Sequence, residues 1–139
     1  MNDCLFCKIV SGEILATKIY ENENFLAFLD IHPVNKGHTQ VIPKKHSRNL
    51  LEIDEETLKE LALLVQKLSQ KIKTALNADG INIISNNEPS AGQIIFHTHI
   101  HIIPRFDGDG LKHWAGKNYA EGEAQVIAEK IKLLKIKKI

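Results

Sequence analysis

Three histidines stand at alternate positions in the stretch His97-Thr98-His99-Ile100-His101. Side chains of an extended strand alternate between its two faces, so this spacing predicts that the three imidazoles share one face. An imidazole can donate a proton, accept one or carry a charge near neutral pH, and a row of three is costly to bury without partners. We therefore expect this histidine row (His97, His99 and His101) to meet a ligand, a metal ion or water in a cleft.

Two kinds of chemistry fit the histidine row. Alternate histidines on a strand can hold one metal ion. Alternatively, one neutral imidazole acts as a nucleophile while its neighbours stabilise the charge that develops. The third interpretation is a strand whose polar face carries histidine without a function, and the threefold repeat at this spacing makes it the weakest of the three.

A second candidate site is the pair Cys4 and Cys7, which two residues separate. This spacing is compatible with half of a zinc site, with a redox pair or with two reduced and buried thiols. A redox pair would stand at the start of a helix in a βαβ unit, and the surrounding sequence indicates no such unit.

Five short strands are predicted to position these residues. Apolar and β-branched runs bounded by turn residues indicate them at 17–20, 25–29, 38–42, 81–85 and 97–103. The first two are expected to form a hairpin. Pro43 and Pro104 are expected to end the third and the fifth strand, because proline cannot donate to a ladder.

Two helices complete the predicted fold. Asp54 is a good N-cap for a long helix, since two glutamates follow it in the first turn. The apolar residues of this helix step by three and four: Leu58, Leu61, Val65, Leu68, Ile72 and Ala75. Residues 77–80 end it, and a second helix is expected over 121–138. The order predicts an α+β fold, with an antiparallel sheet of about five strands, one long helix and a C-terminal helix.

Length and composition fit one globular domain over residues 1–139, with 43% hydrophobic and 25% charged residues. The formal net charge of +1 gives no support for binding to nucleic acid. We find no apolar segment typical of a signal peptide and no run of 18 apolar residues, so we expect no membrane span. The expected compartment is the cytosol, where the two cysteines stay reduced.

The histidine row and its flanks resemble a known family. Residues 97–103 resemble the alternating pattern of the histidine triad family of nucleotide hydrolases and transferases, with Thr98 at one apolar position. Further similar segments are Cys4–Ile9, Ala27–Ile31, Gly37–His46 and the loop residues Asn86, Gly92 and Gln93. The resemblance covers residues 4–105.

The resemblance implies a two-step nucleotidyl transfer. His99 would attack an α-phosphorus to form a nucleotidyl-histidine intermediate, and water would release a nucleoside monophosphate. His38 and His101 would donate to the phosphate oxygens. A purine nucleotide would be bound by Asp30 at the ribose, by Asn86 and Gln93 at the phosphate, and by Phe6, Ile9, Phe28 and Ile31 at the base.

The resemblance also implies a structural zinc ion and a homodimer. The implied zinc ligands are Cys4, Cys7, His46 and His97, which would form a closed tetrahedral site without an open position for water. In the implied dimer, the long helix and a strand lie at the contact, and the sheet is continuous across the two subunits.

Two points leave the choice of substrate open. Many members of the family carry Ser or Thr after the glutamine of the phosphate loop, whereas this chain has Ile94. Residues 103–105 resemble the branch that cleaves diadenosine polyphosphates, and residues 4–9 resemble the branch that cleaves nucleoside phosphoramidates. The other function classes are a metal-dependent hydrolase with His97, His99 and His101 as ligands, and a nucleotide-binding protein with little turnover.

Overall fold

The computed structural model describes residues 3–139. The chain divides into two compact units, of which one ends at Asp109 and the other runs from Gly110 to Ile139. The prediction of a single domain over residues 1–139 stays a prediction.

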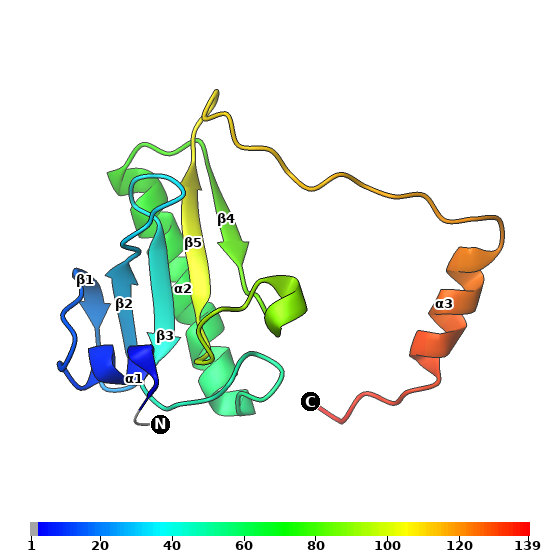
Figure 1. Ribbon diagram of the computed structural model, residues 1–139, viewed down its shortest axis with the longest axis horizontal. Coiled ribbons are helices and arrows are strands. Elements are labelled where there is room, and N and C mark those ends of the chain that lie inside the picture. The colour runs from blue at the N-terminus through cyan, green and yellow to red at the C-terminus, as the bar shows by residue number, and fades with distance from the viewer. Residues whose placement is uncertain (1–2) are drawn as a thin grey trace. The chain divides into compact units, whose positions relative to one another are not determined.

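The first unit is built on a five-stranded antiparallel sheet with the strand order β1-β2-β3-β5-β4 (Figure 1). Its elements are α1 (Leu5–Val10), β1 (Lys18–Glu21), β2 (Phe25–Leu29), β3 (Thr39–Pro43), α2 (Glu55–Ala75), β4 (Gly80–Ile84), the 3₁₀ turn η1 (Pro89–Ala91) and β5 (Ile100–Arg105). This architecture confirms the predicted α+β fold with an antiparallel sheet and one long helix.

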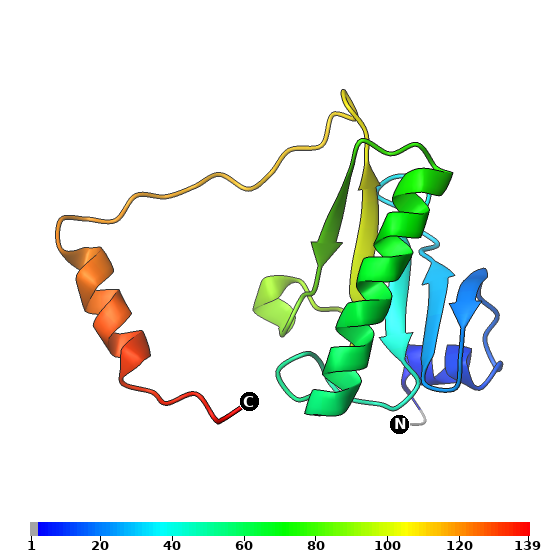
Figure 2. The same ribbon diagram turned by 180° about the vertical axis from the view of Figure 1, so that it is seen from behind.

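The long helix α2 lies along one face of the sheet (Figure 2). Asp54 is its N-cap and accepts a hydrogen bond from the backbone N–H of Thr57, as the sequence predicts. The buried side of α2 packs against alternate residues of β2, β3 and β5, among them Ile100 and Ile102. These two isoleucines therefore point away from the face that carries the histidine row.

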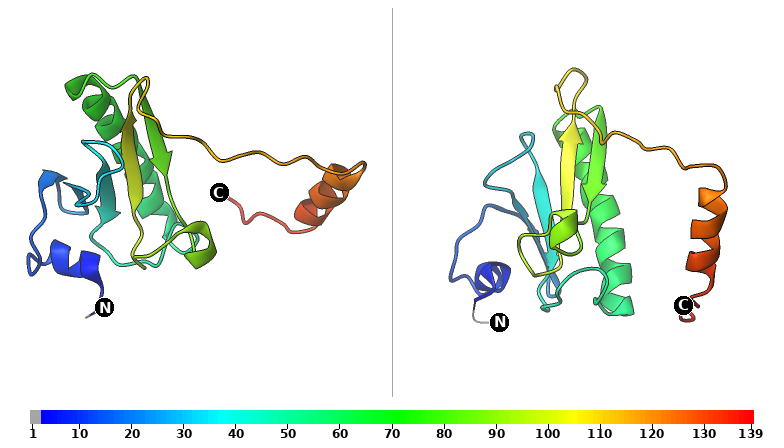
Figure 3. Two further views of the ribbon diagram at one scale, coloured as in Figure 1. Left: turned by 45° about the horizontal axis from the view of Figure 1, so that its top comes forward. Right: turned by 45° about the vertical axis from the view of Figure 1, so that its right-hand side comes forward.

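The short helix α1 covers the opposite face, so that the sheet lies between α1 and α2 (Figure 3). Phe6 and Ile9 of α1 pack against Leu26 and Phe28 of β2 and Ile42 of β3. Alternation along β2 thus sends neighbouring residues to two different cores. The sequence analysis did not predict α1, because a helix of six residues shows too few apolar positions for a periodic signal.

Strand β5 differs from its prediction at both ends. It begins at Ile100, because the pairing with β3 starts at Val41 and Ile100 and the pairing with β4 ends at Ile84 and His101. Residues 97–99 therefore lie outside the ladder. Pro104 does not end the strand. Strand β3 pairs with β5 only as far as Ile102, and beyond it β4 is the only pairing partner among the described residues, so proline is tolerated there.

The second unit contains α3 (Glu123–Lys132), which is shorter than the predicted helix over 121–138. Gly122, in a left-handed conformation with φ 75°, begins it. No residue of α3 is buried within the unit, so packing does not stabilise further turns beyond Lys132. Among the residues that the structure describes, no helix combines the length and the hydropathy of a membrane span.

Candidate active site

A cavity of about 460 Å³ lies between α1, the end of β2 and the loop that leads to β5. The sequence-predicted site residues on its wall are Phe6, Ile9, Phe28, Asp30, Ile31, Asn86, His99 and His101. The wall combines apolar side chains with a few convergent polar groups, as small-molecule sites usually do. Its volume is in the range of pockets that hold a nucleotide-sized ligand.

His99 presents one defined ring nitrogen to this cavity. Its Nδ1 lies 2.7 Å from the carbonyl oxygen of His97, and a carbonyl only accepts, so Nδ1 carries the proton. The lone pair is therefore on Nε2. Burial lowers the pKa of His99, against the opposing effects of this hydrogen bond and of Asp30. The ring is thus neutral and nucleophilic near pH 7.

His101 presents the opposite character. The backbone N–H of Val34 donates to Nδ1 of His38 (3.1 Å), so His38 carries its proton on Nε2. That nitrogen lies 2.9 Å from Nδ1 of His101 and donates to it. His101 must then carry its own proton on Nε2, which makes it a hydrogen-bond donor.

The protonation states of these two rings follow from their surroundings. The pKa of His101 is lowered to about 4, first by burial and then by His99 and His38. Burial also lowers the pKa of His38. The carboxylate of Asp30, whose Oδ2 lies 3.6 Å from Nε2 of His38, opposes this shift. His38 does not line the cavity. It acts behind His101, where it selects the tautomer.

Asp30 stands at the end of β2 with both carboxylate oxygens engaged. Oδ1 accepts from the backbone N–H of His32 (2.8 Å), and Oδ2 accepts from the side-chain amide of Gln40 (2.7 Å). Each oxygen keeps acceptor capacity for a ligand hydroxyl. The sequence analysis missed Gln40, which also lines the cavity. The alternation of the third strand could have indicated Gln40, because it follows His38 by two positions and so lies on the same face.

A second group of side chains lies beside the cavity. Donor atoms of Cys4, Cys7, His46 and His97 all lie within 4.8 Å of one another. His97 is fully buried, and its Nε2 donates to the carbonyl of Pro43 (2.7 Å), which leaves the lone pair on Nδ1. That lone pair faces the other three donors of this Cys/His cluster.

The spacing of the cluster can be compared with a tetrahedral zinc site. Ligands at zinc bond lengths and tetrahedral angles lie about 3.5 Å apart for a sulfur–nitrogen pair and about 3.3 Å apart for two nitrogens. Here Sγ of Cys4 and Nδ1 of His97 are 3.4 Å apart, and Sγ of Cys7 and Nδ1 of His46 are also 3.4 Å apart. The two Nδ1 atoms of His46 and His97 are 3.2 Å apart. The donor set and its spacing fit zinc.

The cysteines of this cluster are tied to α1. Cys4 is the N-cap, and its Sγ accepts from the backbone N–H of Cys7 at 3.3 Å. Burial raises the pKa of the Cys7 thiol to about 11, and Cys4 adds to the effect. A bound cation reverses this preference, because a coordinating thiol is deprotonated.

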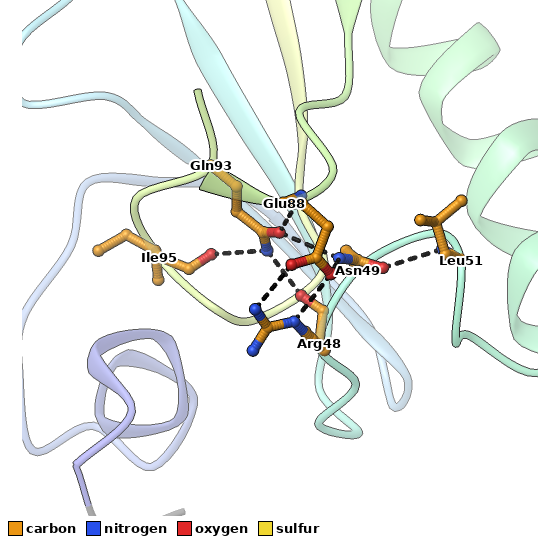
Figure 4. Close-up of polar contacts among 6 residues, drawn as sticks. All are labelled: Arg48, Asn49, Leu51, Glu88, Gln93 and Ile95. Atoms are coloured by element: carbon orange, nitrogen blue, oxygen red, sulfur yellow. Dashed lines mark hydrogen bonds and ion pairs between the residues drawn. The ribbon is translucent and has the colours of Figure 1, made fainter. Parts of the chain in front are cut away.

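Gln93 does not line the cavity, and its side chain contacts neighbouring loop residues instead (Figure 4). Its amide nitrogen donates to the carbonyls of Arg48 (2.7 Å) and Ile95 (3.1 Å). Its Oε1 accepts from the backbone N–H of Glu88 (2.8 Å) and from the side-chain amide of Asn49 (3.1 Å). A contact between this side chain and a phosphate would break one of these bonds. Gln93 therefore shapes the loop from within.

Comparison with known proteins extends these observations. The HIT domain family is matched over residues 11–108. A Streptococcus mutans protein of known structure is 46% identical, with a TM-score of 0.90 over 96% of this chain and 85% of that chain. A zinc-bound histidine triad family protein from Mycobacterium smegmatis is 40% identical, with a TM-score of 0.76 over 95% of this chain and 96% of that chain. An adenylylsulfatase from Arabidopsis thaliana is 43% identical over 117 residues, which are 84% of this chain and 58% of that protein.

Proposed function

This chain belongs to the HIT domain family, and from that premise we propose that it cleaves nucleotides at the α-phosphate through a covalent nucleotidyl-histidine intermediate. The observation that carries the proposal is the pair of fixed tautomers. Nε2 of His99 holds a lone pair and Nε2 of His101 holds a proton, and both rings line one cavity. A nucleophile and a donor for the phosphate oxygens are the two groups that this reaction needs.

The first step forms one bond and breaks another. Nε2 of His99 attacks the α-phosphorus, and the bond from phosphorus to the leaving group breaks with its electron pair going to that group. The carbonyl of His97 stabilises the positive ring that forms, since it already accepts from Nδ1–H. His101 donates to a phosphate oxygen as negative charge develops there.

The second step releases the product. Water attacks the α-phosphorus, the bond to Nε2 of His99 breaks, and a nucleoside monophosphate leaves. The electron pair returns to Nε2, so the ring regains its neutral tautomer. In the first step the leaving group takes a proton from His101 or from water as it departs, because Ile94 offers a backbone N–H and no hydroxyl. The proton that the attacking water loses in the second step restores this donor.

The cavity suits a purine nucleotide in the following arrangement. Asp30 accepts from the ribose hydroxyls, and Phe6, Ile9, Phe28 and Ile31 provide apolar contact to the base. Asn86 and the backbone of the loop up to Gln93 lie at the phosphate. Amines, sulfate or a second nucleotide can all leave from the same adenylyl phosphorus, and similarity to an adenylylsulfatase supports an adenylyl substrate.

We also propose that the Cys/His cluster holds a structural zinc ion. Four protein ligands leave no open position, so zinc there would crosslink the N-terminal segment to the histidine row and supply no step of the reaction. Similarity to a zinc-bound relative and the fit of the donor spacing support this assignment.

A homodimer is the third part of the proposal. β4 is an edge strand of the sheet, and Ile83 on it is 53% exposed. An edge of this kind is suited to continuing a sheet into a second subunit. Light scattering on the purified protein tests the dimer, and a monomeric mass at micromolar concentration would contradict it.

The test of the activity is turnover of adenosine 5′-phosphoramidate and of a diadenosine polyphosphate, each with and without a chelator. The variant His99→Ala removes the nucleophile, and His113→Ala is the matched control because His113 is an exposed histidine of the second unit. AMP release that resists the chelator and disappears only in His99→Ala supports the proposal. Release that the chelator abolishes at once would favour a metal-dependent hydrolase instead. Nucleotide binding without release would indicate a binding protein.

A further inference from the structure

Four consecutive residues, Ser47 to Leu50, follow strand β3 in the chain and contact the segment 86–98, which includes the loop 86–95 on the cavity wall. The carbonyl of Ser47 accepts from the backbone N–H of Thr98 at 2.8 Å. The backbone N–H of Leu50 donates to the side chain of Asn87 at 2.9 Å. The two residues between them hold the centre of the loop. We call this stretch, 47–50, the loop seam.

The loop seam contains a bidentate ion pair between Arg48 and Glu88. Two parallel hydrogen bonds of 2.9 and 2.7 Å join the guanidinium to the carboxylate (Figure 4). The same guanidinium stacks 4.4 Å above the ring of Phe96, the residue before His97. The side-chain amide of Asn49 donates to Glu88 as well, at 2.8 Å. A bidentate pair fixes both distance and orientation, which a single contact would not.

Glu88 is held in a backbone conformation that its residue type avoids. Its φ is 76° and its ψ is 157°, a region that is essentially restricted to glycine. Such a conformation persists only where the surroundings determine it. Here Arg48 and Asn49 hold the carboxylate, and Oε1 of Gln93 holds the backbone N–H. These contacts of Glu88 therefore keep the loop in this conformation.

The loop that these contacts hold is the part of the cavity wall closest in sequence to the histidine row. Asn86, Gly92, Ile94 and Ile95 line the cavity, and each lies within seven residues of Glu88. The amide of Gln93 is engaged by the carbonyls of Arg48 and Ile95. Of the loop residues that line the cavity, only Asn86 has a polar side chain, so the lining part of the loop offers a phosphate its backbone and that side chain. Both depend on the loop's conformation.

We propose that Arg48, Asn49 and Glu88 are positioning residues that hold the loop 86–95 in the form that binds the phosphate of the nucleotide. The proposal rests on the proposed function, because it assigns the loop to the phosphate. Through the loop, these three residues support the affinity that a nucleotide gains over the corresponding nucleoside by its phosphate.

The electrostatic setting agrees with a contact that persists over a wide pH range. The hydrogen bonds from Arg48, and then those from Asn49, lower the pKa of Glu88 to about 2. Glu88 therefore stays ionised at any pH at which the protein is assayed. Both side chains are partly exposed, so salt weakens their attraction, whereas the hydrogen bonds of Asn49 and Gln93 remain.

The test compares the affinities of AMP and adenosine, by calorimetry, in the wild type and in three variants. Arg48→Ala removes the guanidinium, Glu88→Gly removes the carboxylate and relieves the backbone, and Glu88→Gln keeps an acceptor for Asn49. Glu55→Gln is the matched control, because Glu55 forms an exposed ion pair with Lys59 on α2, far along the chain from the loop.

The expected result is a selective loss. If the binding-competent form of the loop becomes a minor form, the apparent affinity for AMP falls in proportion, by about 10-fold in Arg48→Ala and Glu88→Gly and less in Glu88→Gln. Adenosine affinity changes by less than about 2-fold, since the nucleoside does not use the phosphate loop. Amide hydrogens of residues 87–95 exchange faster in the same variants. Glu55→Gln leaves all three quantities unchanged.

Two results would overturn the inference. One is an equal loss of AMP and adenosine affinity in Glu88→Gln and Arg48→Ala, which would mean that the contacts serve only general stability. The other is an unchanged AMP affinity in all three variants. A wild type that binds AMP no better than adenosine would remove the proposed function together with the inference, whereas a wild type with AMP affinity and unaffected variants removes the inference alone.

Discussion

Two successive members of the histidine row, His97 and His99, use the same residue type for different purposes. At one end, His97 donates from Nε2 to the carbonyl of Pro43 and turns Nδ1 to the Cys/His cluster. Two residues on, His99 donates from Nδ1 to the carbonyl of His97 and turns Nε2 to the cavity. The backbone acceptor that each ring meets decides which nitrogen is left to act.

Burial does not distinguish these two histidines. The pKa of His97 is lowered to about 4 and the pKa of His99 is also lowered, with burial as the first cause in each case. Neutral rings are required of a zinc ligand and of a nucleophile alike. The hydrogen bond at the second nitrogen, and not the charge state, therefore assigns a histidine of this row to the cluster or to the cavity.

After loss of His99, the largest expected effect on turnover comes from loss of His38. Replacing His38 by Ala removes the donor that keeps the proton of His101 on Nε2. We expect kcat to fall by roughly 100-fold to 1,000-fold, the usual cost of losing one oriented donor to a developing charge. Steady-state rates with adenosine 5′-phosphoramidate measure it. The zinc content should not change, and a kcat within about 3-fold of wild type would show that the tautomer of His101 is irrelevant.

In the Cys/His cluster, the variant His97→Ala should affect metal binding and the stability of the fold more than it affects turnover. The cluster loses one of four ligands, so the zinc content falls to a small fraction and the melting temperature drops by roughly 10 °C or more. Elemental analysis and calorimetry measure these two quantities. Turnover per folded molecule, measured well below the melting temperature, should stay much closer to wild type than in His38→Ala. If it is abolished while the zinc content is normal, His97 belongs to the chemistry and the comparison fails.

The smallest expected effect is that of pH. The pKa of His101 is lowered from 6.5 to about 4, so the folded protein binds this proton less readily than the unfolded chain does. The resulting stability is present above about pH 6.5 and is lost as the pH falls from there toward about 4. We expect kcat to vary by less than about 2-fold between pH 8 and pH 6. A midpoint near pH 6.5 in the rate profile would mean that the rings titrate as exposed histidines.

Much of the site could be predicted from the alternation of side chains. Ile100 and Ile102 pack toward α2 and His99 and His101 turn to the cavity, although residues 97–99 have no strand partner. An extended backbone alternates its side chains whether or not a ladder is present. The resemblance to a family supplied His46 as the fourth member of the Cys/His cluster, which no local pattern indicated.

The remaining features depend on distant backbone atoms. The sequence predicts that Gln93 binds the phosphate, whereas its amide nitrogen donates to the carbonyl of Arg48, forty-five positions away in sequence. The continuation of β5 through Pro104 depends on where β3 stops pairing. The partner of the Gln93 amide and the end of the β3 pairing both depend on residues far away in the sequence. The residues next to Gln93 and Pro104 therefore do not predict them.

The measurement that tests the central claim most directly is rapid quenching of the wild-type protein with adenosine 5′-phosphoramidate, followed by mass mapping of the peptide that carries the histidine row. We expect an adenylyl group on His99, and none on His97 or His101, that appears and decays at rates compatible with turnover. Turnover without any adduct, or an adduct on His101, would contradict the assignment of the nucleophile by its tautomer.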